Sequence, residues 1–207
     1  MRYHYKTILV RLTEGVAVVK LNTQESKKDM DVDNKRELAN FLNRAKEDPQ
    51  IKAIVLTGKN GAFFAGRTLK VSNIAGLSVD LRHKEKRNDL AWLIRDMGKP
   101  VIAAVNGFAI GAGMKLALAC HLVVASEKAK FYEVLNEELY FAARSYSARQ
   151  ALESGLVYRI VSDGELIEKA MDVARSAIRG EVFFNTGRAP ELAPDYGFGR
   201  IMEEQPA

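Results

Sequence analysis

Short apolar runs alternate with segments of helical periodicity along most of this chain. Residues 7–12 and 16–21 have the pattern of two strands, and Gly15 lies in the short turn between them, as in a hairpin. Residues 33–48 repeat apolar side chains at i, i+3, i+4 and i+7, which predicts a helix with one buried stripe. The β-branched run at 51–57 predicts a buried strand, and the Gly-rich residues after it predict a loop with a short strand.

The same alternation continues toward the C-terminus. Apolar spacing predicts a helix around residues 90–97, a buried strand at 101–105 and a helix that begins near Ala112. Two further runs, 121–125 and 157–161, predict two more strands. Strands and helices that alternate in this way predict an α/β fold.

Two capping boxes indicate where the last helices begin. Ser147 with Gln150 three residues later predicts a helix over 147–154. Ser162 with Glu165 predicts a second helix, which continues through residue 178. We expect this second helix to bury a stripe made of Ile167, Ala170, Ala174 and Ile178.

The length and the C-terminal composition predict one domain with a tail. A domain typically takes roughly 100–200 residues, and this chain has 207. From Gly180 onward, glycines and prolines interrupt every period. We therefore expect a folded domain over residues 1–179 and an irregular tail over residues 180–207.

Composition and charge narrow the function classes. The 31 Lys and Arg against 26 Asp and Glu give a net charge of +5, which suits an anionic ligand. Basic residues interleaved with exposed aromatics are lacking, so a nucleic-acid partner is not expected. No apolar run approaches the roughly 20 residues of a membrane span, and the N-terminus lacks the apolar core of a signal peptide, so we expect a cytoplasmic protein that does not span a membrane.

The cysteine and histidines indicate neither a disulfide nor a metal. Cys120 is the only cysteine, so an intrachain disulfide is excluded, and the three histidines lack metal-ligand spacing. We expect Cys120 to be a core thiol and His121 a partly buried core residue rather than a catalyst.

The stretch NGFAIGAGMKLALAC, residues 106–120, holds three glycines and a single charge, Lys115. A strand, a Gly-rich turn and a helix form several phosphate-binding motifs, but neither the dinucleotide fingerprint nor the P-loop matches here. Glycine lets the backbone approach a ligand, and a helix that starts near Ala112 presents free N–H groups, which together suit an anion or an oxyanion. Alternatively, Gly111 and Gly113 only permit close packing between the helix and the sheet.

Three segments in order resemble the enoyl-CoA hydratase/isomerase (crotonase) family. They are NGAFFAGRTLK (60–70), KPVIAAVNGFAIGAGMKLALACHLVVASEKAKF (99–131) and SARQALESGLVYRIVSDGELIEKAMDVA (147–174). The resemblance covers roughly residues 7–178. It implies a spiral of β-β-α units with helices packed on the sheet. The family's C-terminal helices have no match after Gly180, so we expect a shortened helical region there.

The resemblance also implies an oxyanion hole for the thioester oxygen of an acyl-CoA. By position, its two donors are the backbone N–H groups of Arg67 and Ala112. Backbone donors suit this task because they are preorganised whatever the side chain. The residues around the two turns would contact the substrate, namely Ala65, Gly66, Leu69, Gly111 and Gly113.

Coenzyme A would be part of the substrate, and no permanently bound cofactor is implied. Lys27 and Lys28 match a loop that can contact the CoA nucleotide, although solvated loop charges are an alternative. By resemblance the partners are an acyl-CoA and further copies of this chain, as a trimer or a dimer of trimers. Because the C-terminal helices lack a match, a dimer or a monomer stays open.

The acid–base groups depart from the family pattern. Family hydratases activate water with two glutamates, and Lys115 occupies the position of the first. An ungapped match puts Leu135 at the second position, and a small gap lets Glu133 take the role; Glu137 and Glu138 are further alternatives. We take Lys115 and Glu133 as the catalytic candidates.

Lys115 has several interpretations. A cation in the first turn of a helix is disfavoured by roughly 0.3–1 kcal/mol, so its placement needs a reason. It could stabilise an enolate, hold a carboxylate of the acyl group, or act as a base after burial lowers its pKa. It could also extend to solvent at a degenerate site. The leading hypothesis is an acyl-CoA-processing enzyme that stabilises an enolate, with isomerisation, decarboxylation and weak hydration open. The alternative is a non-catalytic acyl-CoA-binding or interaction protein.

Overall fold

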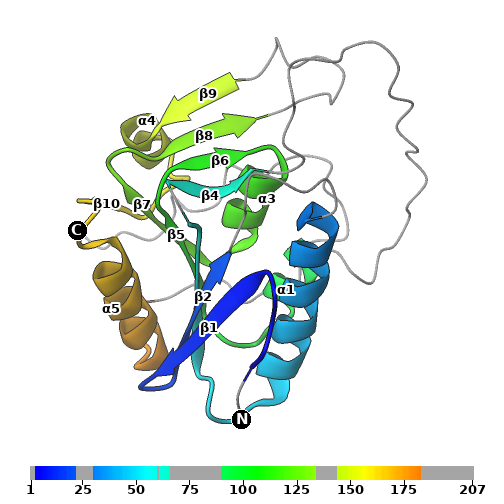
Figure 1. The fold of residues 1–207 in the computed structure, drawn as a ribbon. Coiled ribbons are helices and arrows are strands. Elements are labelled where there is room, and N and C mark those ends of the chain that lie inside the picture. The colour runs from blue at the N-terminus through cyan, green and yellow to red at the C-terminus, as the bar shows by residue number, and fades with distance from the viewer. Residues whose placement is uncertain (1–2, 22–29, 60, 66–89, 134–143, 183–207) are drawn as a thin grey trace, which may run out of the picture.

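The computed structural model describes residues 3–21, 30–59, 61–65, 90–133 and 144–182. Two β-sheets and five helices make up this part of the chain (Figure 1). In chain order, the elements of the structure are β1 (Ile8–Thr13), β2 (Val16–Leu21), α1 (Met30–Glu47), β3 (Ala53–Thr57), β4 (Ala62–Ala65), α2 (Leu90–Arg95), β5 (Val101–Val105), β6 (Phe108–Ile110), α3 (Ala112–Ala119), β7 (Leu122–Ser126), β8 (Lys130–Glu133), β9 (Arg144–Ser147), α4 (Ala148–Glu153), β10 (Arg159–Val161) and α5 (Leu166–Ile178).

Successive strands are shared between the two sheets. The larger sheet has the order β1-β2-β3-β5-β7-β10 and the smaller one has the order β4-β6-β8-β9. Each of β3, β5 and β7 lies in the larger sheet, and the strand that follows it lies in the smaller sheet. Within each sheet these strands are parallel neighbours, so the chain advances by one strand in both sheets at every turn. This arrangement is the predicted spiral.

Two clusters of buried apolar side chains hold the helices and the smaller sheet against the two faces of the larger sheet. In Figure 1, α5 lies on one side of the larger sheet and α1 on the other. Side chains of α5 such as Ala170 and Ala174 pack on Val55 and Ile102 of the sheet. The opposite face packs against α1, α2, α3 and the smaller sheet in one cluster that includes Phe41 and Phe131. The smaller sheet is thereby held against α3, which positions the candidate site.

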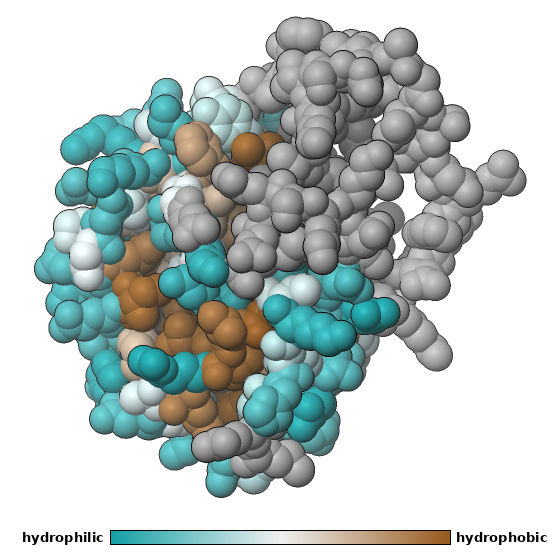
Figure 2. Space-filling view, viewed as in Figure 1, coloured by the Kyte–Doolittle hydropathy of each residue, from teal (hydrophilic) through white to brown (hydrophobic). Residues whose placement is uncertain are grey.

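The β1–β2 hairpin forms as predicted, one residue later at its start. Its two turn residues, Glu14 and Gly15, have φ angles of 51° and 81°, which suits a two-residue turn between antiparallel strands. Along the edge strand β1, Leu9 and Leu12 keep 55% and 40% of their surface exposed. Figure 2 shows an apolar area on this side of the molecule.

The structure confirms one capping box and corrects the other. The Ser147 hydroxyl accepts a hydrogen bond from the Gln150 amide, and the Gln150 side chain accepts one from the Ser147 amide. At the second position, the Ser162 hydroxyl instead donates to the Glu165 carboxylate at 2.5 Å. Helix α5 begins only after Glu165, which is its N-cap and makes no side-chain capping bond.

The predicted stripe of α5 is wrong in part. Ala170 and Ala174 are buried, whereas Ile167 is 37% exposed. The buried set is Leu166, Ala170, Val173, Ala174 and Ala177. The sequence allows both stripes, and the position of the sheet under the helix selects the second. Strand β10 is also shorter than predicted, with Val157 buried ahead of it.

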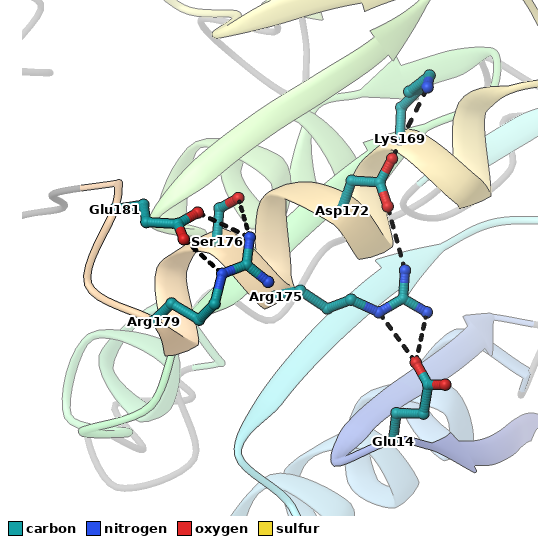
Figure 3. Close-up of polar contacts among 7 residues, drawn as sticks. All are labelled: Glu14, Lys169, Asp172, Arg175, Ser176, Arg179 and Glu181. Carbon is teal, nitrogen blue, oxygen red and sulfur yellow. Dashed lines mark hydrogen bonds and ion pairs between the residues drawn. The ribbon is translucent and has the colours of Figure 1, made fainter.

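A polar cluster connects α5 to the first hairpin (Figure 3). Arg175 extends from α5 to the carboxylate of Glu14 in the β1–β2 turn, with its Nε at 3.1 Å and its Nη2 at 2.9 Å from Glu14 Oε2. Arg175 also binds Asp172 on the same helix. The contact between Arg175 and Glu14 joins residues 161 positions apart, so it holds the last described helix against the first hairpin.

Candidate functional site

The carboxyl ends of three strands meet at one edge of the smaller sheet. In the parallel pairing of β4 with β6, Ala65 lies opposite Ile110. In the pairing of β6 with β8, Ile110 lies opposite Tyr132. The ends of β4, β6 and β8 therefore lie side by side at this edge, and β6 is followed directly by α3 (Figure 1).

A tight turn at Gly111 joins β6 to α3. Gly111 has φ 52° and ψ −107°, a conformation that a side chain would strain. Its N–H donates to the Tyr132 carbonyl at 3.0 Å, and its carbonyl accepts the first helical bond from the Lys115 N–H at 3.0 Å. The N–H groups of the first turn, that of Ala112 among them, precede this bond and have no partner within the helix. Neither a side-chain cap nor an acidic residue in the first turn competes for them.

Gly107 and Gly113 make room for the neighbouring strand. A methyl group built on Gly113 would lie 1.6 Å from the Phe64 carbonyl oxygen, and one built on Gly107 would lie 1.7 Å from the Gly61 carbonyl oxygen. Close packing of helix and sheet, one of the two interpretations of these glycines, is thus present at Gly113. Substrate contact by Gly111, Gly113 and Ala65 stays a prediction.

The two catalytic candidates, Lys115 and Glu133, differ in burial. Lys115 is exposed in the first turn of α3, while Glu133 is half-buried at the end of β8. Residues alternate between the two faces of a strand, so Glu133 shares a face with Phe131. Phe131 is fully buried in the cluster that includes α3 residues, so this face looks toward α3. Within the described residues, no ion pair or side-chain hydrogen bond involves either Lys115 or Glu133.

His121 and Cys120 belong to the core, as predicted. The His121 Nδ1 accepts a hydrogen bond from the backbone N–H of Val101 at 2.9 Å. The backbone N–H of His121 donates to the Val101 carbonyl at 2.8 Å. Burial holds the pKa of His121 below its ordinary value. Cys120 is buried, and burial raises the pKa of its thiol well above the ordinary range, which makes it a poor nucleophile.

Several predicted site residues lie outside the described residues. These are Lys27, Lys28, Gly66, Arg67 and Leu69, together with the alternative positions Leu135, Glu137 and Glu138. Most of the predicted tail, residues 183–207, lies outside them as well. Their predicted roles stay predictions.

Two contacts around the smaller sheet escape sequence reasoning, one at each end of β4 and β6. The Asn106 side chain accepts a hydrogen bond from the Gly58 N–H at 3.2 Å, which links the segments after β5 and β3. The Phe64 carbonyl, which packs on Gly113, belongs to a residue 49 positions away. Because any residue supplies a carbonyl, no sequence signal marks Phe64, whereas the Asn-Gly pair at 106–107 is a turn signal that draws attention to Asn106.

The described ranges contain neither a metal-binding cluster nor a membrane-spanning helix. Within these ranges, no group of three or more His, Cys, Asp or Glu side chains is arranged to hold a metal ion. Of the described helices, none combines the length and the apolar character that crossing a bilayer requires.

Comparisons with known proteins show the family of this chain. The family model described as enoyl-CoA hydratase/isomerase matches residues 11–140. A putative enoyl-CoA hydratase of Thermus thermophilus is 31% identical over 198 residues, which is 83% of this chain and 78% of that protein. A 1,2-epoxyphenylacetyl-CoA isomerase of Escherichia coli is 30% identical over 195 residues, covering 81% and 74% of the two chains.

A solved structure supports the same conclusion. The crystal structure of an enoyl-CoA hydratase from Bacillus anthracis superimposes with a TM-score of 0.66 at 28% identity, over 84% of this chain and 77% of that one. The chain therefore belongs to the enoyl-CoA hydratase/isomerase family. The predicted α/β spiral and the predicted family are both confirmed.

Proposed function

We propose that this chain processes acyl-CoA thioesters by stabilising an enolate where β4, β6 and β8 end. The observation that carries the proposal is the register that brings Ala65, Ile110 and Tyr132 into one row beside the N-terminus of α3. Coenzyme A enters as part of the substrate, and the proposal involves no permanently bound cofactor. Two relatives, a putative enoyl-CoA hydratase and a 1,2-epoxyphenylacetyl-CoA isomerase, support the substrate class.

The thioester oxygen would be held by two backbone donors. The N–H of Ala112 is the donor on α3, and the N–H of Arg67, two positions after the end of β4, is the proposed second donor. When the α-proton leaves, the electron pair of the C–H bond moves toward the thioester carbonyl and negative charge collects on its oxygen. Removing one such donor typically lowers kcat by about 10²–10³.

Glu133 is the proposed acid–base group. Its carboxylate would take the α-proton, and the resulting carboxylic acid would return a proton to the conjugated carbon chain, so that no net proton is consumed. One carboxylate is enough to move a double bond along an acyl chain by this route. The face that Glu133 shares with Phe131, toward α3, supports the assignment.

Lys115 is the proposed electrostatic partner of the enolate. Its exposed side chain follows the Ala112 donor by three positions, and a cation there adds to the positive end of the helix dipole. A carboxylate on the acyl group would be held in the same way, which keeps decarboxylation open beside isomerisation. Hydration is the less favoured reaction, because Lys115 replaces one of the two carboxylates that hydratases of the family use.

A non-catalytic acyl-CoA-binding or interaction protein is the second candidate. It is favoured by the lone carboxylate among the described residues at this edge, since Glu133 has no acidic partner there. Under this hypothesis the chain binds CoA thioesters without turnover. The two candidates differ in one property, the exchange of the α-proton.

The test is calorimetry followed by proton exchange. The chain is titrated with CoA, acetyl-CoA and crotonyl-CoA, and butyryl-CoA is then incubated in D₂O while deuterium at its α-carbon is followed by mass spectrometry. We expect binding and exchange, with exchange lowered at least about 100-fold by Glu133→Gln. Binding without exchange supports the second candidate, and absence of binding to every thioester rejects both.

We also propose a cytoplasmic location and a homo-oligomer, a trimer or a dimer of trimers. The oligomer rests on the family resemblance. Light scattering coupled to size exclusion measures the mass in solution. A monomer at micromolar concentration would contradict the oligomer.

A further inference from the structure

Both ends of β4 are packed against a glycine of the neighbouring turn. At the start of β4, the Gly61 carbonyl oxygen occupies the space where a Cβ of Gly107 would lie, and near its end the Phe64 carbonyl oxygen does the same for Gly113. The two imagined methyl groups fall 1.7 and 1.6 Å from these oxygens. At both ends, β4 therefore packs against a position that carries no side chain, as it also does at Gly58, whose Cβ would lie 1.8 Å from the Ala62 carbonyl oxygen.

The hydrogen bonds between β4 and β6 do not by themselves fix the position of β4. The pairing of β4 with β6 shifts its register between Ala62 and Phe64. A strand with such an irregularity bends locally, so its two halves need separate restraints. The contacts with Gly107 and Gly113 lie on either side of the shift and supply one restraint for each half.

The two glycines have different relations to the candidate site. Gly113 directly follows Ala112, and its partner Phe64 directly precedes Ala65, the last residue of β4. Gly107 and its partner lie at the opposite end of the strand, ahead of Phe108 and Ala62. Only the Gly113 contact joins the first turn of α3 to the end of β4 where the site is proposed.

We propose that Gly113 is a positioning residue, and that its contact with the Phe64 carbonyl sets the separation between the Ala112 N–H and the carboxyl end of β4. This inference rests on the proposed function, since that separation is the width of the proposed oxyanion hole. The glycine acts by permitting the contact and not by touching the thioester.

The clash at Gly113 determines how far the proposed donors would be displaced. Non-bonded carbon and oxygen atoms stay more than about 3 Å apart, so a methyl group on Gly113 must displace the end of β4 or the first turn of α3 by more than about 1 Å. An oxyanion donor acts only within about 2.7–3.1 Å of the oxygen that it stabilises. A misplacement of about 1 Å is enough to lower a rate about 100-fold.

Gly107→Ala is the matched control for Gly113→Ala. It creates a clash of the same kind and size with the same strand, at the end away from the site. We expect both variants to lose thermal stability. In Gly113→Ala we expect the saturating rate of α-proton exchange to fall about 10- to 100-fold, with the Kd for CoA within about threefold of the wild type. In Gly107→Ala we expect exchange within about threefold of the wild type.

The outcomes separate this inference from the proposed function. If the wild type binds and exchanges butyryl-CoA while both variants lose exchange equally, or neither does, Gly113 is not a positioning residue and the proposed function stands. If the wild type neither binds nor exchanges thioesters, the proposed function itself fails. A parallel loss of CoA binding and exchange in Gly113→Ala also overturns the inference, because it indicates general disruption.

A second variant serves if Gly113→Ala does not fold. Ala65→Gly adds backbone freedom at the end of β4 without introducing a clash. We expect its saturating exchange rate to fall about 3- to 10-fold. An unchanged exchange rate in a folded Ala65→Gly variant would contradict the inference.

Discussion

Arg175 of α5 binds Glu14 in the turn of the first hairpin, across 161 positions of sequence, with its Nη2 2.9 Å from the Glu14 carboxylate. The two side chains are 31% and 69% exposed, so water and salt weaken the pair. The contact nevertheless joins the β1–β2 hairpin, at one edge of the larger sheet, to α5, which covers one face of that sheet. Its contribution to stability is therefore measurable.

We expect Arg175→Met to lower the free energy of unfolding by about 0.5–1 kcal/mol, because the pair with Glu14 and the bond to Asp172 are both lost. Urea denaturation at low salt and at 1 M NaCl measures it, and the difference from the wild type should shrink at high salt. Arg36→Met is the control, since among the described residues Arg36 pairs only with Asp33 three residues earlier, and it is 75% exposed. Equal losses in the two variants would show that the connection to the hairpin is not stabilising.

The Glu37 carboxylate makes the start of β1 sensitive to acid. Burial raises the pKa of Glu37, but hydrogen bonds from the Thr7 hydroxyl and from the amides of Lys6, Thr7 and Ile8 outweigh it and hold the pKa below its usual value. A carboxyl group with a lowered pKa stabilises the fold above its unfolded pKa, and this stability is lost as the pH falls through the folded pKa.

We expect Glu37→Gln to lower the free energy of unfolding at pH 7 by about 1 kcal/mol, since charge-assisted bonds become neutral ones. The difference from the wild type should shrink as the pH falls through the lowered folded pKa of Glu37 and vanish below it, where both side chains are neutral. Urea denaturation at several pH values measures it, with Glu153→Gln on the exposed face of α4 as control. A difference that persists at low pH would mean that the charge is irrelevant.

His121 is a second residue that makes the stability of the fold sensitive to acid, and it acts at a higher pH than Glu37. Burial lowers its pKa, and its Nδ1 accepts the Val101 N–H only when it is unprotonated. The stability from neutral His121 is thus complete above its unfolded pKa of about 6.5 and is lost as the pH falls through the lower folded pKa. We expect His121→Asn, which keeps an acceptor for Val101, to flatten the pH dependence of stability between pH 7 and 5. Thermal unfolding measures this, and the exposed His4→Asn should leave the dependence as in the wild type.

Lys115 tests the link between the helix and the chemistry. Lys115→Glu replaces a cation by an anion in the first turn of α3, so we expect a gain in stability of roughly 0.5–1 kcal/mol. In the proposed site the same change should weaken α-proton exchange and permit some hydration of crotonyl-CoA. Lys115→Gln, which removes the charge alone, is the control. If Lys115→Glu changes neither thioester binding nor any rate in a chain that does exchange α-protons, Lys115 lies outside the site.

Much of the fold follows from local pattern. The β1–β2 hairpin, the helix α1, the strands β3, β5 and β7 and the capping box at Ser147 all appear where the sequence predicts them, within a few residues. Each depends on interactions within a few positions, such as turn geometry, apolar periodicity or a side chain that bonds a nearby amide. Family membership followed from motifs of the same local kind.

The division into two sheets and the stripe of α5 needed the whole chain. Ile167 fits the apolar period as well as Leu166 does, and only the sheet beneath α5 decides that Leu166 is buried. Strand β9, which pairs with β8 through Arg144 and Glu133, was not predicted. Its pairing depends on a partner strand and not on its own pattern.

The sequence by itself determined most of the elements, their order and the three glycines of residues 106–120, because propensity and period are local properties. Only the tertiary structure decided what those glycines contact: Gly113 meets the Phe64 carbonyl, Gly107 meets that of Gly61, and Gly111 turns the chain into α3. It also decided that Glu133 stands on the face toward α3 while Lys115 is exposed. The physical reason is that a backbone carbonyl carries no sequence signature, so a contact with one is set by how the strands are stacked.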